Sequence, residues 1–475
     1  MAQTDLIGRD AAGLLADLRR GAVRAEAVMD ACLERIAAVN PQVNAIVSLR
    51  DADALMAAAR DADAVPEAAR GPLHGLPMAV KDLAEVAGLP TSWGSPVHAR
   101  HVSRRDTPFV ARLRAAGAIF IGKTNTPEFG LGSHSYNAVH GTTRNPYDPA
   151  RSAGGSSGGA AVGLAARMLW LADGSDMMGS LRNPAAWNNV FGFRPTHGVV
   201  PGDPEGELFL HPLSTDGPMA RSVADLALLL DVMAGDDPRV PSARPGHPQV
   251  RAALDRPPAP CRIGWIGDWG GYYPLEDGVA EACAPGLQAL AAQGHRVEEV
   301  IPPFDPADLW QSWCDLRAFA VASRHGPLLD DPATRALLKP ELAWEIARGR
   351  ALDGAAIARA GAIRSDWFRA TLRMFADFDV LALPAAQCFA FPAEWTWPRA
   401  VGGRDMDTYH RWMEVVVPAS LIGLPALAVP SGFGPTGLPM GLQLLAPRGG
   451  DAALLALGHA CDRASRLPER HPPPV

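Results

Sequence analysis

Two clusters of serine and glycine lie between residues 152 and 183 of this 475-residue chain. The first reads Ser-Ala-Gly-Gly-Ser-Ser-Gly-Gly over residues 152–159, and the second places Gly179 before Ser180. Glycine lets the backbone beside a serine adopt conformations closed to other residues and approach a ligand closely. A flexible linker is the simpler interpretation, but a linker is not followed at once by mostly apolar residues such as 160–172. The pattern therefore favours a site that uses serine hydroxyl groups.

Three kinds of chemistry use serines in such a segment. A nucleophile elbow, Gly-x-Ser-x-Gly, fits around both Ser156 and Ser157, but an elbow caps an apolar strand, and residues 145–151 are polar and contain two prolines. A phosphate-binding loop carries Gly-Lys-Ser/Thr after a strand, and this serine-rich segment contains no lysine. The third is a serine activated by a lysine, because a desolvated lysine loses its proton readily and then acts as a base.

The lysines of this chain are few. Three of the 44 basic residues are lysine, and the remaining 41 are arginine; the lysines are Lys81, Lys123 and Lys339. A guanidinium group in effect cannot act as a base, so a lysine kept in an arginine-rich chain is a candidate for one. Lys81 follows the apolar residues 76–80, which predict a short strand, and we expect it to be the base.

Ser180 precedes a segment that has the features of a helix start. We expect Asn183 to cap that helix and Pro184 to occupy its first turn. Backbone N–H groups just before a helix are suited to hold an oxyanion. The residues alone do not decide whether Ser156, Ser157 or Ser180 is the nucleophile.

The rest of the chain supplies alternating helices and short apolar strands, which predict an α/β core covered by helices on both faces. A stretch rich in proline over residues 236–260 has little apolar periodicity and reads as a surface linker. The expected helices cover residues 11–21, 24–38, 51–64, 107–116, 222–233 and 279–292 and much of 306–376. The expected strands cover residues 76–80, 118–121, 168–172, 190–193, 262–266, 296–300, 380–383, 426–429 and 441–445.

Composition restricts the partner and the compartment. A net charge of −7 and a pI near 6.0 argue against a nucleic-acid-binding protein, which would carry a basic face. The six cysteines form no Cys-x-x-Cys pair, so neither a zinc site nor a disulfide framework is indicated. No segment reaches the roughly 18 apolar residues of a membrane span, and residues 1–10 are not a signal peptide. We therefore expect a cytoplasmic protein that acts on a small molecule.

Four motifs, in this order, resemble the amidase signature family, which includes fatty acid amide hydrolase, malonamidase, indoleacetamide hydrolase and the A subunit of glutamyl-tRNA amidotransferase. The resemblance covers nearly the whole chain, and motifs of this length and order are specific. They are Pro-Leu-His-Gly-Leu-Pro-Met-Ala-Val-Lys-Asp at 72–82, Gly-Lys-Thr-Asn at 122–125, the glycine-rich residues 154–159, and Gly-Ser-Asp-Met-Met-Gly-Ser-Leu-Arg-Asn-Pro at 174–184.

The resemblance implies a Ser-cisSer-Lys triad. Ser180 falls on the nucleophile, Ser156 on the serine whose preceding peptide bond is cis, and Lys81 on the base. The backbone N–H groups expected to hold the oxyanion belong to Met177, Met178, Gly179 and Ser180. Supporting roles fall on Ser157, Asp176 and Arg182, and Leu131 and Ser133 are candidates for the substrate pocket.

The same resemblance implies the fold and the reaction. We expect one amidase domain over residues 1–475, with a large mixed β-sheet, catalytic motifs in residues 1–235 and a second half, residues 261–470, that shapes the substrate site. The expected reaction is hydrolysis of a carboxylic amide to an acid and ammonia or an amine, without metal or organic cofactor. The alternative is a glutaminase subunit that supplies ammonia to a partner protein. A homodimer is compatible with either activity, and no contact with nucleic acid or membrane is expected.

Met178 departs from the family pattern. Many members have glycine where this chain has Met178 before Gly179 and Ser180. A positive φ at Met178 would be unfavourable. The alternative is that the Met178 side chain narrows the acyl pocket while its N–H still faces the oxyanion.

Overall fold

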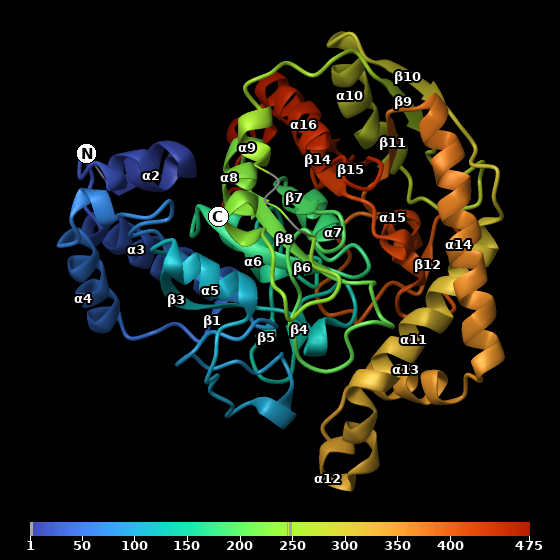
Figure 1. Cartoon of the computed structure of the whole chain (residues 1–475), viewed down its shortest axis with the longest axis horizontal. Helices are drawn as coiled ribbons and strands as arrows, with labels where there is room; N and C mark the ends of the chain where they lie inside the picture. The colour runs from blue at the N-terminus through green and yellow to red at the C-terminus, as the bar shows by residue number, and fades with distance from the viewer. Residues whose placement is uncertain (1–2, 245, 247–248) are drawn as a thin grey trace.

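A mixed eight-stranded sheet runs through the structure, a computed structural model that describes residues 3–244, 246 and 249–475 (Figure 1). Strand β9 is parallel to β10 and β11, and the other neighbouring strands are antiparallel. The predicted mixed sheet is therefore confirmed. In spatial order its strands are β10 (Arg296–Glu299), β9 (Arg262–Trp265), β11 (Val380–Pro384), β15 (Pro439–Leu445), β14 (Ala426–Phe433), β7 (Phe191–Arg194), β8 (Thr215–Ala220) and β6 (Leu171–Asp176).

Helices cover both faces of this sheet. Gly458 of one helix lies against Leu427 of β14, whereas Ala186 of another lies against Gly441 of β15. Gly441 pairs with Pro430, and Leu427 and Pro430 are an odd number of residues apart, so their side chains point to opposite faces. The helices packed on the sheet include α16 (Asp451–Ser465), α10 (Val279–Ala292) and α8 (Val223–Met233), with α7 (Arg182–Trp187) on the opposite face from α16.

A separate three-stranded sheet carries the candidate base. Its order is β1 (Ile46–Val47), β3 (Ile119–Thr124) and β2 (Pro77–Lys81), with β2 parallel to β3 and β1 antiparallel to it. Lys81 ends β2, as predicted. Strand β3 continues past the predicted end at residue 121, so Lys123 lies within a strand. Residues 117–124 also fit the spacing of a phosphate-binding loop, but β3 occupies the place where such a loop would be.

The helices before residue 120 agree with the predicted ranges, with one correction and one addition, because the helix at Gln3–Gly8 was not predicted. Helix α3 was expected to end before residue 40 but continues through Pro41. Proline removes its own N–H donor, and here it sits in the last turn, where Asn40 accepts hydrogen bonds from Ala45 and Ile46 at 2.8 Å. The helices are α1 (Gln3–Gly8), α2 (Ala11–Arg19), α3 (Ala25–Val43), α4 (Ala52–Asp63) and α5 (Pro108–Ala115).

Long helices fill most of residues 306–376, as expected (Figure 1). Helix α11 contacts α13 and α14. Part of the predicted linker over residues 236–260 lies outside the described residues, and a short helix, α9 (Val250–Ala253), lies within it. The remaining elements are α6 (Gly158–Ala165), α11 (Pro306–Asp330), α12 (Pro332–Arg335), α13 (Pro340–Arg350), α14 (Gly354–Asp377), α15 (Val417–Ile422), α17 (Leu467–Arg470) and the two hairpins β4 (Tyr136–Asn137) with β5 (Gly141–Thr142) and β12 (Ala400–Val401) with β13 (Arg404–Asp405).

Two large hydrophobic clusters meet at the loop after β6. Leu181 belongs to the cluster built from the N-terminal helices, β2, β3 and α6. Met178 belongs to the cluster built around α10, α11 and α14. The loop that carries Ser180 is therefore fixed from both sides by core packing.

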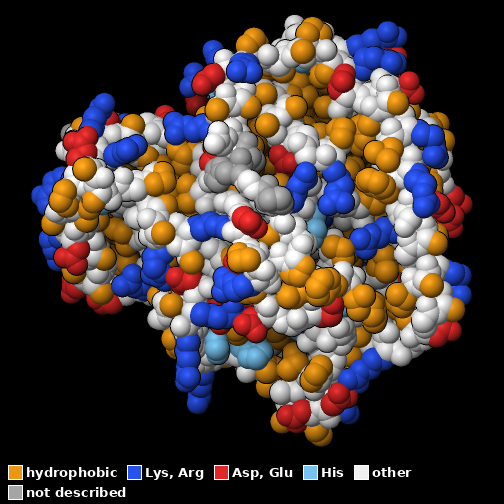
Figure 2. All heavy atoms as spheres, viewed as in Figure 1, with side chains coloured by type: hydrophobic (Ala, Val, Ile, Leu, Met, Phe, Trp, Pro, Cys, Tyr) orange, Lys and Arg blue, Asp and Glu red, His pale blue; other side chains and the backbone are white. Residues whose placement is uncertain are grey.

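Basic and acidic side chains are interspersed over the face shown in Figure 2. No helix in the described part of the chain is long and apolar enough to cross a membrane. The six cysteines are free thiols, and all but Cys261 are buried.

Candidate active site

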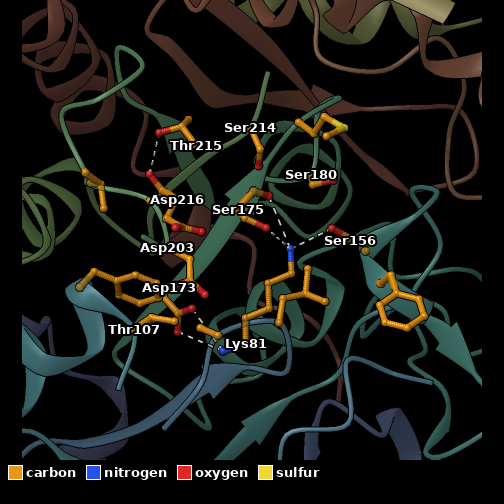
Figure 3. A pocket seen from close by; sticks show the side chains of 18 of the residues that line it. Lys81, Thr107, Ser156, Asp173, Ser175, Ser180, Asp203, Ser214, Thr215 and Asp216 are labelled. Carbon is orange, nitrogen blue, oxygen red and sulfur yellow. Dashed lines mark hydrogen bonds between the residues drawn. The ribbon is translucent and has the colours of Figure 1, made fainter. Parts of the chain in front are cut away.

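Lys81 is buried at the end of β2, and its ammonium group points at hydroxyl groups (Figure 3). Its Nζ donates hydrogen bonds to the Oγ atoms of Ser156 at 2.8 Å, Ser157 at 2.8 Å and Ser175 at 2.9 Å. No carboxylate of the described residues lies within ion-pair distance of it. Burial lowers the pKa of Lys81 to about 7, although Asp173, Asp216 and Asp176 act in the opposite direction. A neutral amine, able to act as a base, is therefore accessible near neutral pH.

The Gly155–Ser156 peptide bond is cis, as the family resemblance implies. The Ser133 hydroxyl fixes Gly155, because it donates to the Gly155 carbonyl of this peptide and accepts, at 3.2 Å, from the Gly155 N–H of the preceding peptide. Ser133 was expected in the substrate pocket, but it does not line the main cavity and instead fixes the backbone before Ser156. Leu131, the other pocket candidate, does line the cavity.

Ser180 lines the same cavity as Lys81 and Ser156. It follows Gly179, whose φ of 78° is in the left-handed region, and a Cβ at that position would meet the Asn183 side chain at 2.4 Å. The Ser180 carbonyl accepts a hydrogen bond from Ser157 at 3.2 Å. Within the described residues, no hydrogen bond joins the Ser180 hydroxyl to Ser156 or Lys81.

The loop after β6 offers backbone donors to the cavity, but not all of those expected. The Gly179 N–H donates to Asp176 at 2.8 Å, so it is already satisfied. Among the described residues, the N–H groups of Met177, Met178 and Ser180 have no acceptor. These three groups are the ones left to hold an oxyanion.

Met178 does not narrow the cavity. Its side chain is buried in the hydrophobic core, with its sulfur 3.1 Å from the indole nitrogen of Trp313. Its φ is not positive, because the left-handed position is Gly179. Met177 is the methionine that lines the cavity, and its sulfur lies 3.3 Å from a guanidinium nitrogen of Arg317.

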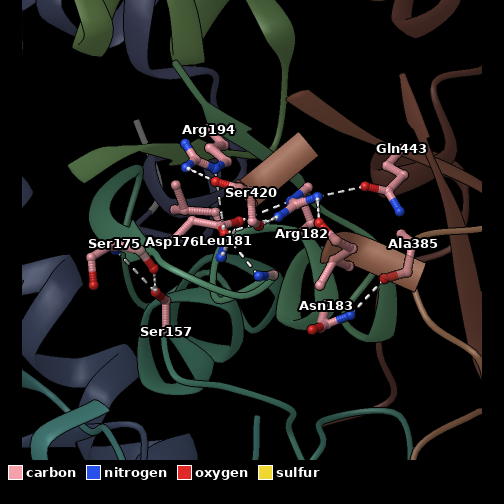
Figure 4. Close-up of polar contacts among 12 residues, drawn as sticks. Ser157, Ser175, Asp176, Leu181, Arg182, Asn183, Arg194, Ala385, Ser420 and Gln443 are labelled. Carbon is pink, nitrogen blue, oxygen red and sulfur yellow. Dashed lines mark hydrogen bonds and ion pairs between the residues drawn. The ribbon is translucent and has the colours of Figure 1, made fainter. Parts of the chain in front are cut away.

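Asp176 and Arg182 form a buried clamp behind the loop (Figure 4). Two nitrogens of Arg182 each donate to the Asp176 carboxylate at 3.0 Å. Burial alone would raise the pKa of Asp176, but Arg182, Arg194 and the Gly179 N–H lower it to about 2. This carboxylate also accepts from the Leu181 N–H at 3.3 Å, so Asp176 caps the turn.

The predicted cap at Asn183 is therefore wrong. Helix α7 begins at Arg182, one residue before Asn183, and the Asn183 side chain donates to the Ala385 carbonyl instead. The first N–H groups of the helix already have acceptors, because Asn183 N–H donates to the Gly179 carbonyl at 2.7 Å and Ala185 N–H to the Leu181 carbonyl at 3.2 Å. Pro184 lies in the first turn, where its missing N–H costs no hydrogen bond.

The cavity has a volume of about 260 Å³. Sequence reasoning missed several of its polar residues. Ser175 lies inside the motif quoted for the family, and Asp173 lies two residues before Ser175, so that motif could have pointed to both. The predicted strand ended at residue 172, whereas β6 continues through them. No sequence signal pointed to Asp216, because strand β8 was not predicted. The residues that line the cavity include Asp173, Ser175, Met177, Asp203, Asp216 and Arg324.

The other two lysines are also withdrawn from solvent, but they do not face the serines. Lys123 is buried and donates to the carbonyls of Lys81 and Ala84. Lys339 is partly buried and donates to the carbonyl of Leu131. Burial lowers the pKa of each to about 8. All three lysines are therefore desolvated amines, but Lys81 is the lysine that contacts hydroxyl groups.

Comparison with known proteins relates the whole chain to a single family. A family model described as Amidase matches residues 27–455. An acylamidase of Rhodococcus erythropolis is 34% identical over 433 residues, which are 90% of this chain and 89% of that protein. The A subunit of the glutamyl-tRNA(Gln) amidotransferase of Thermus thermophilus is 36% identical over 474 residues, 95% of this chain and 96% of that protein. The solved structure of a bacterial aryl acylamidase of the amidase signature family matches with a TM-score of 0.90 and 25% identity, over 98% of this chain and 99% of that one.

Proposed function

We propose that this protein, which belongs to the amidase signature family of amide-hydrolysing enzymes, cleaves its amide through an acyl-enzyme formed on Ser180. Its fold is the amidase signature fold. Ser156 and Lys81 relay protons to and from Ser180. The products are a carboxylic acid and ammonia or an amine, and the protein's own side chains supply the acid and base steps.

In the first half of the reaction, the Ser180 oxygen attacks the carbonyl carbon. Its proton passes to Ser156 as the Ser156 proton passes to neutral Lys81. The carbonyl π electrons move to the oxygen, and the unpartnered N–H groups of Met177, Met178 and Ser180 are placed to hold that oxyanion. The C–N bond then breaks as the leaving nitrogen takes a proton from Ser156, which Lys81 replaces.

In the second half, a water molecule attacks the acyl-enzyme. Its proton leaves through Ser156 to Lys81, and the bond between the acyl carbon and Ser180 breaks. The Ser180 oxygen recovers a proton through the same relay. The relay requires contact between Ser156 and Ser180, and we propose that substrate binding brings it about, since catalytic hydrogen bonds are often long in unliganded enzymes.

One observation carries this proposal. A lysine desolvated to a pKa of about 7 donates to Ser156 at 2.8 Å in the cavity that Ser180 also lines. By contrast, Asp176, the residue that follows Ser175 on β6, forms a buried ion pair with Arg182. Lys123 is equally buried but donates to backbone carbonyls, whereas Lys81 donates to three serine hydroxyl groups.

The second half of the chain shapes the substrate site in this proposal. Helix α11 contributes Ala320, Val321, Arg324 and His325 to the cavity wall. The whole chain then acts as one amidase domain. Its cytoplasmic location and homodimeric assembly stay predictions.

A second candidate is a glutaminase subunit that passes ammonia to a partner. It is favoured by the 36% identity to the Thermus protein over almost the full length of both chains. The purified protein, without partners, separates the two. An amidase releases ammonia or amine from alkyl, aryl or amino-acid amides, whereas the glutaminase candidate acts on glutamine and gains activity only with a partner. A wild-type rate that Ser180→Ala matches on every active amide would refute the Ser180 mechanism.

A further inference from the structure

Asp216 is an acidic residue of the cavity that the proposed chemistry does not use. It lies on β8 directly opposite Ser175 of β6. Residues directly opposite in an antiparallel pair share one face, with Cβ atoms about 5 Å apart. Ser175 accepts a hydrogen bond from Lys81 at 2.9 Å, so the Asp216 side chain lies on the face that carries the catalytic lysine (Figure 3).

The neighbouring aspartates all have partners. Asp173 accepts from the Lys81 N–H at 3.2 Å, Asp176 is paired with Arg182, and Asp203 accepts from two nitrogens of Arg105 at 2.8 Å. The carboxylate of Asp216 accepts no hydrogen bond and forms no ion pair within the described part of the chain. It is partly buried and lines the cavity, so it is open to a ligand.

The surroundings leave this carboxylate without a compensating charge. Burial, together with Asp173, raises the pKa of Asp216 to about 7, and Lys81 only partly opposes this. Arg324 at the cavity wall is exposed and not within ion-pair distance. Burial also lowers the pKa values of the lining residues His197, to about 4, and His325, to about 3, so both are neutral at pH 7. A cation brought by the ligand would remove this penalty.

We propose that Asp216 is a specificity-determining residue that binds a protonated amine of the substrate. The inference rests on the proposed function, because it concerns the same cavity. The preferred substrates are then small amides with an ammonium group close to the scissile bond. The cavity volume of about 260 Å³ lies below the roughly 300–1,000 Å³ of sites for drug-sized ligands, which agrees with a small substrate.

Isosteric pairs of amides test this directly. Alaninamide and isobutyramide differ by an ammonium in place of a methyl group, as do 3-aminopropanamide and butanamide. Wild type should show a kcat/KM at least about tenfold higher for the cationic member of one pair, the ratio that one charged hydrogen bond supplies. Asp216→Asn should abolish this preference, chiefly through KM for the cation, and any change in kcat that comes from its effect on Lys81 should be shared by the neutral amide.

Asp203→Asn is the matched control. It removes a carboxylate of the same cavity that already has Arg105 as its partner, so the preference for the cationic member should persist. Equal losses on both members in Asp216→Asn would show that Asp216 acts on Lys81 and not on the substrate. A wild-type preference for the neutral amides would overturn the proposal outright.

A binding measurement keeps the test independent of turnover. In Ser180→Ala, calorimetry should give a Kd for one cationic amide at least about tenfold lower than for its neutral isostere. Adding Asp216→Asn should make the two values equal. Equal or undetectable binding of both amides before that second change would refute the inference, even if other amides are hydrolysed. The proposed function fails separately, if no amide is turned over by wild type.

Discussion

Two aspartates on neighbouring positions of the β6–β8 pair have opposite environments. Asp176 pairs with Thr215, and Asp216 pairs with Ser175. Burial would raise the pKa of each carboxyl, but two arginines lower that of Asp176 to about 2, whereas that of Asp216 rises to about 7. One face of this strand pair is thus neutralised by ion pairs and the other is not.

The difference shows how one strand pair serves two tasks. The Asp176 side is closed, because Arg182 also donates to Val416, Gln443 and Ser420 (Figure 4). It ties the loop of Ser180 to the second half of the chain. The opposite side leaves Lys81 and Asp216 without ion-pair partners among the described residues, and uncompensated groups with shifted pKa values are typical of catalytic sites.

The largest effect is expected at Lys81, because replacing it removes the base from the face of the strand pair that carries Lys81 and Asp216. Lys81→Met should lower kcat roughly a thousandfold, within the range of 10²–10⁴ for a general base. Lys81→Arg should be as inactive, because a guanidinium keeps its proton. Rates on the best amide found, with circular dichroism as the folding control, check this.

The same base sets the acid limb of the wild-type profile. The rate should rise as pH increases through about 7, where Lys81 loses its proton, although the observed value belongs to the coupled Lys81 and serine network. A near wild-type rate in Lys81→Arg would contradict the proposal that neutral Lys81 acts as the base.

On the closed face, the principal loss should be in stability. Arg182→Met leaves Asp176 as a buried charge with one arginine fewer, and breaking such a pair costs about 3–5 kcal/mol. Arg369→Met, which breaks an exposed pair with Asp366 on α14, is the control and should change little. Urea unfolding of both variants makes the comparison. Equal midpoints would contradict the role of the clamp.

A smaller effect separates the adjacent methionines. Met178→Ala removes a buried side chain from the core and should cost about 2–5 kcal/mol, with little change in substrate preference. Met177→Ala should cost less stability but raise kcat/KM for bulky acyl amides relative to short ones, because Met177 lines the cavity. Thermal unfolding and a paired-substrate assay on both variants test this. The reverse pattern would restore Met178 as the pocket wall.

The sequence predicted the features that depend on local pattern. The burial of Lys81 at the end of a strand followed from apolar residues 76–80 and from the scarcity of lysine. The α/β core followed from alternating helices and strands, whereas the mixed sheet was implied by the resemblance to the amidase signature family. The roles of Ser133 and Asn183 could not be predicted, because their partners, Gly155 and Ala385, are 22 and 202 residues away in the chain.

The importance of Asp216 was hidden for a related reason. It depends on the register between β6 and β8, and residues 215–220 include glycine, proline and aspartate, which are disfavoured in strands. The backbone pairing with β6 and β7 overrides that preference. The environment of a carboxylate, and so its pKa, is set by such non-local pairing.

In the proposed mechanism, Lys81 and Ser156 activate Ser180, which is the nucleophile. A fluorophosphonate probe followed by peptide mapping of the adduct tests it most directly. We predict a single adduct on Ser180 in wild type, no adduct in Ser180→Ala, and much slower labelling in Lys81→Met. An adduct on Ser156 or Ser157 would contradict the account and favour the nucleophile elbow.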